Sequence, residues 1–276
     1  MLRLLLLQVL ASCLWLGHSE VVTSPASCPQ FFYQGITPNE ALEPQKPAWI
    51  CQRYNNSYHF ATLYDRDRRI PVYSAYVYEP GTAKRPHSWW FVEPQLIGKN
   101  NLKEMERESV LIEQHKFTSQ DIEKSQAVLD DYKKMQGLDR GHLSPNGHLT
   151  SRESKTATFT LTNVVPQDSN LNNGEWNIYE RKTMPKATQS CDTTYVITGA
   201  VPGNTYVAND RVNRPSHIWS AACCLVGTTP TDAWGVIAEN DKNDKFPLLK
   251  LWQLEETLTE LYGGKKVTLF DSACPR

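Results

Sequence analysis

Three mainly hydrophobic segments in the first third of the chain are separated by short polar stretches. The segments 48–54, 59–64 and 70–78 are rich in tyrosine and β-branched residues, and this pattern predicts β-strands. The polar turn Asn55-Asn56-Ser57 joins the first two strands, and Pro80-Gly81 follows the third. We therefore expect an antiparallel meander here, preceded by an irregular Pro- and Ser-rich arm over 20–48.

Helix-like and strand-like segments are mixed in the remaining sequence. Helical periodicity predicts a helix over 118–136, capped by Thr118 or Ser119 and ended by Gly137, and another over 244–262 with Asp244 as its cap. Further strands are predicted at 193–201, 217–226, 233–239 and 266–270. Because no regular βαβ rhythm appears, we predict an α+β fold in one domain, 20–276. The second helix is expected to face inward with Leu248, Leu251, Trp252, Leu258 and Leu261.

The segment 81–117 has no clear period. Trp89-Trp90-Phe91 in this segment can be a core plug or an exposed patch, and burial of large aromatic side chains favours the plug.

Composition restricts the class of protein without choosing a function. The 276 residues are 40% hydrophobic and 21% charged, which is typical of a chain that folds around a core. A formal net charge of −1 excludes a globally basic nucleic-acid binder, although a local basic groove remains compatible with it.

The N-terminal residues 1–19 predict a secretory signal peptide. Arg3 precedes an apolar run over 4–16, and the small residues Gly17 and Ser19 follow it. A membrane anchor is the alternative, but a span needs about 20 apolar residues. We expect a secreted, extracellular protein with no membrane span.

The cysteines fit export. After removal of Cys13 with the signal peptide, six remain, and six cysteines allow 15 pairings. Adjacent Cys223 and Cys224 are expected on opposite faces of a strand, with different partners. Asn55-Asn56-Ser57 is also a glycosylation sequon.

The segment 137–183 holds the strongest chemical pattern. In a short strand from Leu138, alternation places Arg140 and His142 on one face and Asp139 on the other. A guanidinium holds phosphate oxygens, and an imidazole accepts a proton from water near neutral pH. The pair is therefore suited to phosphodiester cleavage, although a purely structural Arg–His pair is the competing interpretation.

The sequence Leu138-Asp139-Arg140-Gly141-His142 resembles the Asp-Arg-Gly-His motif of the DNA/RNA non-specific endonucleases. The segment 163–176 (NVVPQDSNLNNGEW) resembles the second motif of this family, and later segments at 195–199 and 215–219 are also similar. The resemblance covers most of 50–270. It implies a ββα-metal nuclease fold, a mainly antiparallel sheet flanked by helices and held by disulfides, that acts on DNA and RNA.

The resemblance also implies roles for individual residues. His142 is expected as the general base and Asn172 as the ligand of one divalent cation, with Mg²⁺ as the favoured ion and Mn²⁺ or Ca²⁺ as alternatives. Arg140 is expected to contact phosphate or support the metal site, and Glu180, eight residues after Asn172, to act through the water shell of the metal. Asn163 would position the first motif or a water, and Gln167 would support the loop. The competing structural roles are a helix cap for Asn172 and a solvated helix face for Glu180.

Two positions depart from the family. Relatives often carry an arginine on the strand before the motif, where 75–78 has none, and another one turn beyond the glutamate, where this chain has Met184. Arg181 and Lys182 are candidates to take over the contact with substrate phosphate. Of the remaining candidates, Trp176 is expected in the core, His148 in a loop and His217 in a structural role.

The sequence therefore predicts a secreted, metal-dependent, non-specific endonuclease. A binding protein that kept the nuclease fold but lost turnover is the first alternative, favoured by the missing arginines. A disulfide-rich extracellular interaction module is the second.

Overall fold

In the computed structural model, residues 21–22, 24–87, 89–133 and 135–276 are described, so the expected signal peptide over 1–19 lies outside the described residues. The centre of the molecule is an eight-stranded sheet in the order β1-β2-β3-β4-β7-β10-β11-β12, and every neighbouring pair in it is antiparallel. The strands are β1 (Val21–Val22), β2 (Pro47–Tyr54), β3 (Ser57–Asp65), β4 (Ile70–Val77), β7 (Thr193–Val201), β10 (His217–Val226), β11 (Thr229–Glu239) and β12 (Leu249–Lys250).

The first hairpin of this sheet forms where the sequence predicts it. Asn55 and Asn56 have φ values of 51° and 61°, and a tight hairpin turn needs two residues in this left-handed region, which asparagine tolerates. The meander β2-β3-β4 is therefore confirmed, and the predicted antiparallel, mixed α+β fold with it.

Two small two-stranded sheets and a set of short helices complete the fold. One sheet pairs β5 (Leu138–His142) with β6 (Val164–Asp168), and the other pairs β8 (Thr205–Val207) with β9 (Val212–Arg214). The helices are α1 (Glu108–Glu113), α2 (Ser119–Glu123), α3 (Leu129–Lys133), α4 (Arg152–Ala157), α5 (Ser169–Asn173), α6 (Glu175–Ile178), α7 (Met184–Ala187) and α8 (Leu251–Leu261), and a π-helical turn over Tyr179–Thr183 connects α6 to α7. Single 3₁₀ turns lie at 25–27, 29–31, 33–35, 40–42, 94–97, 146–148 and 161–163.

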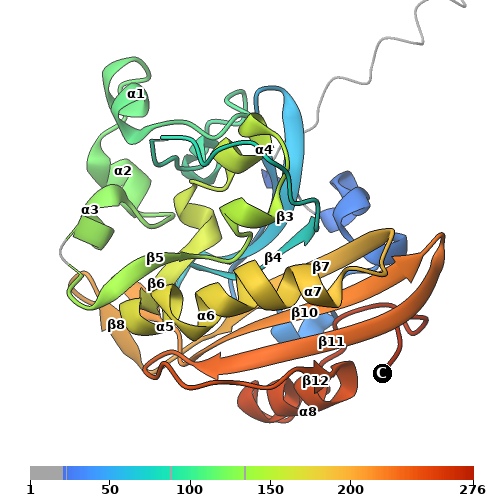
Figure 1. Cartoon of the computed structure of the whole chain (residues 1–276). Coiled ribbons are helices and arrows are strands. Elements are labelled where there is room, and N and C mark those ends of the chain that lie inside the picture. The colour runs from blue at the N-terminus through green and yellow to red at the C-terminus, as the bar shows by residue number, and fades with distance from the viewer. Residues whose placement is uncertain (1–20, 23, 88, 134) are drawn as a thin grey trace, which may run out of the picture.

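The two faces of the main sheet carry separate cores. Figure 1 shows α8 against one face and the short helices α1–α7 on the other side of the sheet. The site face is the one covered by β5, β6 and α1–α7, where Leu143, Trp176 and Tyr179 are buried. The back face is covered by α8 and by both ends of the described chain, with Phe32, Leu254 and Phe270 buried.

Three disulfides join the six cysteines among the described residues. They link Cys28 to Cys51, Cys191 to Cys224, and Cys223 to Cys274. As predicted, the adjacent Cys223 and Cys224 have different partners, because one contributes to the back-face core and the other to the site-face core. Cys28 secures the irregular N-terminal arm to β2, and Cys274 secures the C-terminal segment to β10.

The helix predicted over 118–136 is wrong in its middle, since the chain forms only α2 and α3 and is not helical between them. The side chain of Gln126 is fully buried there, and its amide both accepts from Glu93 N (2.7 Å) and donates to Glu93 O (2.9 Å). The Ala127 N–H donates to the Tyr64 hydroxyl (3.1 Å). These long-range bonds replace the local helical bonds and end the helix.

Three further predictions are corrected. The second helix begins at Leu251, not Asp244, because 249–250 pair with β11. Of its predicted inner face, Leu251 and Leu258 are buried, whereas Leu248, Trp252 and Leu261 are exposed. The segment 266–270 is no strand, although Leu269 and Phe270 are buried. The aromatic plug is only partial, since Trp89 is 69% exposed while Phe91 is buried.

No helix in the described part of the chain combines the length and apolar character that a membrane span requires.

Candidate active site

The strands β5 and β6 and the helix α5 form a ββα unit over the site face. In the β5–β6 register, Arg140 lies opposite Pro166 and His142 opposite Val164. Gly141 between them allows close contact with β6, because a Cβ atom there would lie 2.1 Å from Gln167 Oε1. The glycine of this motif is thus required by the buried side chain of Gln167, which packs against the strand as expected of a supporting residue.

Arg140 and His142 lie on the same face of β5, as strand alternation predicts. The guanidinium of Arg140 stacks on Trp90, 4.6 Å from the ring centroid, and the ring of His142 lies 5.5 Å from the same centroid. Phe159 contacts the His142 ring edge-on, 5.4 Å between centroids. Trp90 and Phe159 therefore form an aromatic wall that fixes the orientation of both polar side chains.

The imidazole of His142 is neutral at physiological pH. Burial, together with the nearby positive charges of Arg85 and Arg140, lowers the pKa of its imidazole to about 3, although a hydrogen bond with the Arg140 backbone opposes the shift. The Nε2 atom has no hydrogen-bond partner among the described residues. A neutral imidazole with a free ring nitrogen is able to accept a proton.

Asp139 on the opposite face of β5 holds Asn172. Its Oδ2 accepts hydrogen bonds from Asn172 Nδ2 (2.9 Å) and Asn173 Nδ2 (2.7 Å), and its Oδ1 accepts one from Ser169 Oγ (3.0 Å). The Asn172 amide is thereby oriented through its nitrogen, and its carbonyl oxygen has no partner in the described part of the chain. The helix cap is supplied by Asp168, which accepts from Asn170 N and Leu171 N, so Asn172 is not the cap.

Asn163 lies in the core and not at the cavity. It is fully buried, with Oδ1 accepting from Ser144 N (2.9 Å) and Ser74 Oγ (2.9 Å), and Nδ2 donating to Ser144 O (3.1 Å) and Thr158 O (3.1 Å). All its hydrogen-bonding capacity is used. It therefore fixes the chain directly after the first motif and has no free atom for a water at the site.

Glu180 reaches the site from the π-helical turn. Burial raises the pKa of its carboxyl to about 8, and Trp176, Arg181 and Arg85 oppose this shift. The backbone carbonyl of Glu180 accepts a hydrogen bond from His148 Nε2 (3.1 Å). His148 is buried and links this turn to β4, since its Nδ1 accepts from the Tyr76 hydroxyl (2.9 Å). His148 therefore has a structural role and lies on a 3₁₀ turn, whereas the sequence predicted that it lies in a loop.

One cavity of about 620 Å³ brings these groups together from separate segments. Its lining includes Arg140 and His142 from β5, Asn172 from α5, and Glu180 and Arg181 from the π-helical turn. Lys182 is exposed and does not line the cavity, and Trp176 is buried in the core as expected. His217 lies elsewhere on β10, where its Nδ1 is 3.0 Å from Ser216 Oγ.

Sequence reasoning missed several lining residues, and the polar ones among them include Arg85, Asn146, Lys155, Asn173 and Asn177. Arg85 lies in the irregular segment after β4, and its guanidinium is 5.1 Å from the centroid of Phe159. The strand at 75–78 carries no arginine, and Arg85 is the cation that the segment after it contributes to the cavity lining. Met184, by contrast, is fully buried, so no cation stands at that position.

The lining residues fit one hydrated divalent cation. Among the described residues, no three His, Cys, Asp or Glu side chains form a metal-binding cluster. The free side-chain carbonyl oxygen of Asn172 and the partly buried carboxyl of Glu180 are oxygen donors, which Mg²⁺ prefers, and Mg²⁺ commonly keeps most of its waters.

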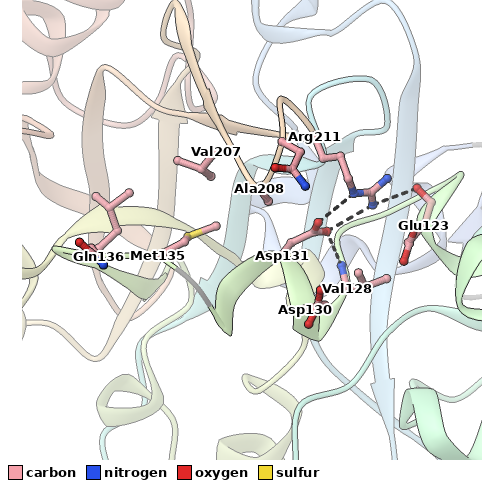
Figure 2. Close-up of a pocket in the computed structure, with 11 residues that line it drawn as sticks. Glu123, Val128, Asp130, Asp131, Met135, Gln136, Val207, Ala208 and Arg211 are labelled. Atoms are coloured by element: carbon pink, nitrogen blue, oxygen red, sulfur yellow. Dashed lines mark hydrogen bonds and ion pairs between the residues drawn. The ribbon is translucent and has the colours of Figure 1, made fainter.

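A second cavity, shown in Figure 2, lacks these features. Glu123, Asp130 and Asp131 line it, and the ion pair of Arg211 with Asp131 (2.8 Å) crosses it. The Val128 N–H also donates to Asp131 (2.9 Å). Its acidic character does not suit a phosphate substrate.

Comparisons with known proteins agree with this arrangement. Residues 37–262 match the family model described as DNA/RNA non-specific endonuclease. The human Endonuclease domain-containing 1 protein is 36% identical to this chain, in a match that covers 76% of this chain and 40% of the human protein. The mouse Endonuclease domain-containing 1 protein is 32% identical, in a match that covers 90% of this chain and 47% of the mouse protein. The chain thus spans less than half the length of these relatives. A crystal structure of the EndoG/EndoGI complex contains a similar fold, with a TM-score of 0.56 and 17% identity over 79% of this chain and 85% of that one.

Proposed function

Because the chain belongs to the DNA/RNA non-specific endonuclease family, we propose that it hydrolyses phosphodiester bonds of DNA and RNA in a metal-dependent reaction. The observation that carries this proposal is the convergence of His142, Asn172 and Glu180 from three segments on one cavity. Phosphate contacts carry no sequence information, so little base specificity is expected.

His142 is the general base of the proposed reaction. Its free Nε2 takes a proton from a water molecule while the water oxygen bonds to phosphorus and the bond from phosphorus to the leaving oxygen breaks. Asn172 Oδ1 would hold Mg²⁺ directly, and Glu180 would act through the water molecules around the ion. Mn²⁺ and Ca²⁺ are the alternative ions. A bound cation neutralises charge that develops on the phosphate.

The remaining polar residues bind substrate or hold the site. Arg140, Arg85 and Arg181 line the cavity and would contact phosphate oxygens, with Lys182 farther out. Asp139 positions Asn172, and Asn163 positions the first motif, through the hydrogen bonds described above.

The proposed setting is extracellular. Removal of residues 1–19 as a signal peptide would leave one domain over 20–276, and three disulfides fit an oxidising compartment. The sequon at Asn55 lies on an exposed turn, where a glycan can be attached.

A second candidate function is nucleic-acid binding without turnover. It is favoured by Met184, which is buried where relatives carry an arginine that can contact phosphate. The intact Arg140, His142 and Asn172 favour catalysis.

The test is digestion of plasmid DNA and of RNA by purified protein, with Mg²⁺ or with EDTA. The expected result is cleavage only with Mg²⁺, reduced about 10²–10⁴-fold in His142→Ala. His115→Ala, which lies outside the cavity lining, is the matched control and should retain the parent rate. Equal digestion by His142→Ala and the parent would refute the mechanism. Binding of both nucleic acids without cleavage would establish the second function instead.

A further inference from the structure

Lys155 on α4 is a buried cation with little to neutralise it. It is only 4% exposed, and lysine is rarely buried to this degree without a charged partner. Its Nζ donates one hydrogen bond, of 3.3 Å, to the carbonyl oxygen of Gly81. An ammonium has three N–H donors, so the described protein atoms leave most of this capacity unused.

The backbone around Lys155 is fixed on both sides. Ser151 and Ser154 form a capping box that sets the start of α4, and Asn146 Nδ2 donates to the Lys155 carbonyl (2.7 Å). Gly81 lies so close to the chain at Thr150 that a Cβ atom there would be 2.3 Å from Thr150 Oγ1. The backbone that carries Lys155 and the Gly81 carbonyl that its Nζ contacts are therefore both held in place.

The cavity that Lys155 lines is the candidate active site, and its charge is mainly positive. Arg85, Arg140, Arg181 and Lys155 all line it, whereas Glu180 is the one carboxyl in the described lining. A buried charge is costly unless it is paired, so an anion in the cavity would compensate Lys155. The volume of about 620 Å³ is large for a single phosphate group and leaves room for more of a substrate chain.

We propose that Lys155 forms a second phosphate subsite, which holds the backbone phosphate next to the one that is cleaved. The inference rests on the proposed nuclease function and makes it more specific. A substrate with at least two backbone phosphates occupies both subsites, whereas a small diester with one phosphate occupies only the site at His142.

The test uses two variants of Lys155 in the full chain. Lys155→Met keeps the apolar stem and removes the charge, and Lys155→Gln keeps a donor for the Gly81 carbonyl. Lys186→Met, which removes an exposed lysine on α7 outside the cavity lining, is the matched control.

Binding is measured by fluorescence anisotropy with a labelled single-stranded oligonucleotide in EDTA, where no cleavage interferes. Both Lys155 variants are expected to bind about tenfold more weakly at low salt. The slope of log affinity against log salt concentration should fall by about 0.7 to 1, because one phosphate contact is lost. With Mg²⁺, kcat/KM for the oligonucleotide should fall about tenfold, and kcat/KM for bis(p-nitrophenyl) phosphate should stay within about twofold of the parent.

Unchanged affinity and salt slope in Lys155→Gln would overturn the subsite, and so would an equal loss on the oligonucleotide and the small diester. Thermal melting identifies a variant that fails to fold. If one of the two Lys155 variants does not fold, the results of the other variant test the subsite. If the parent protein binds and cleaves the oligonucleotide and the variants do so equally well, only this inference is overturned. If the parent protein neither binds nor cleaves, the proposed function is refuted as well.

Discussion

The site face and the back face of the main sheet are built in different ways. On the back face, α8 packs Leu251, Leu254 and Leu258 on an apolar core, and two disulfides hold the chain ends against it. On the site face, the helices are short and broken, and titratable groups such as His142, His148 and Lys155 lie at low exposure between them.

The difference separates stability from chemistry within one sheet. Burial of apolar surface on the back face stabilises the fold without any requirement on protonation. Buried polar groups on the site face cost free energy unless they are paired, and groups whose pKa is shifted are the ones a catalyst uses. Substitutions in the back-face core should therefore mainly lower stability, whereas substitutions of the candidate catalytic groups on the site face should mainly lower activity.

The largest expected effect on stability is at Leu254, which lies over Gly235 of β11, where a Cβ atom would be 2.5 Å from Leu254 Cδ2. Leu254→Ala should lower the free energy of unfolding by about 2–5 kcal/mol, because a fully buried side chain leaves a cavity. Urea unfolding measures the change.

The control for this substitution is Trp252→Ala on the same helix, which removes a side chain that is 48% exposed and should cost far less. Nuclease activity per folded molecule should stay at the parent level in both variants. A loss of activity in folded Leu254→Ala would mean that the back face is not energetically separate from the site.

A smaller effect is expected from the pH dependence of His148. Burial lowers the pKa of its imidazole to about 4, below the ordinary value of 6.5. As the pH falls, His148 is therefore protonated at a higher pH in the unfolded chain than in the folded protein. The contribution of neutral His148 to stability is fully present above about pH 6.5 and is lost as the pH falls towards 4. Over this window the loss approaches about 3 kcal/mol.

His148→Gln removes the titration, so its unfolding free energy should change less between pH 7 and pH 4.5 than that of the parent. Urea unfolding at several pH values provides the comparison. Parallel curves for the two proteins would show that His148 is not the group responsible.

The smallest effect is predicted for Asp139, which orients Asn172 without lining the cavity. Asp139→Ala should lower the apparent Mg²⁺ affinity of the nuclease about 10–100-fold, because the Asn172 amide is no longer held. A titration of activity with Mg²⁺ measures it. Asp139→Asn keeps an acceptor oxygen and should lose less, and an unchanged Mg²⁺ dependence in Asp139→Ala would contradict the positioning role.

Local pattern was sufficient wherever neighbours in the chain decide the structure. The tyrosine and β-branched residues of 70–78 and the Asn55-Asn56 turn predicted the meander, and strand alternation placed Arg140 and His142 on one face of β5. It failed in 118–136, where helical periodicity was interrupted by the bonds of Gln126 with Glu93, thirty-three positions earlier in the chain. It failed again at 244–250, because β12 pairs with β11 before α8 begins.

The sequence by itself determined the long strands of the main sheet, the spacing of the two motifs and the residue types that phosphodiester chemistry needs, since these depend on local residue pattern and on side-chain chemistry. Tertiary structure alone decided which groups meet. Arg85 and Lys155 reach the cavity from segments with no periodic signal, and Asn163 turns inward to four hydrogen bonds. Such contacts are set by the packing of distant segments over the sheet, which no local pattern records.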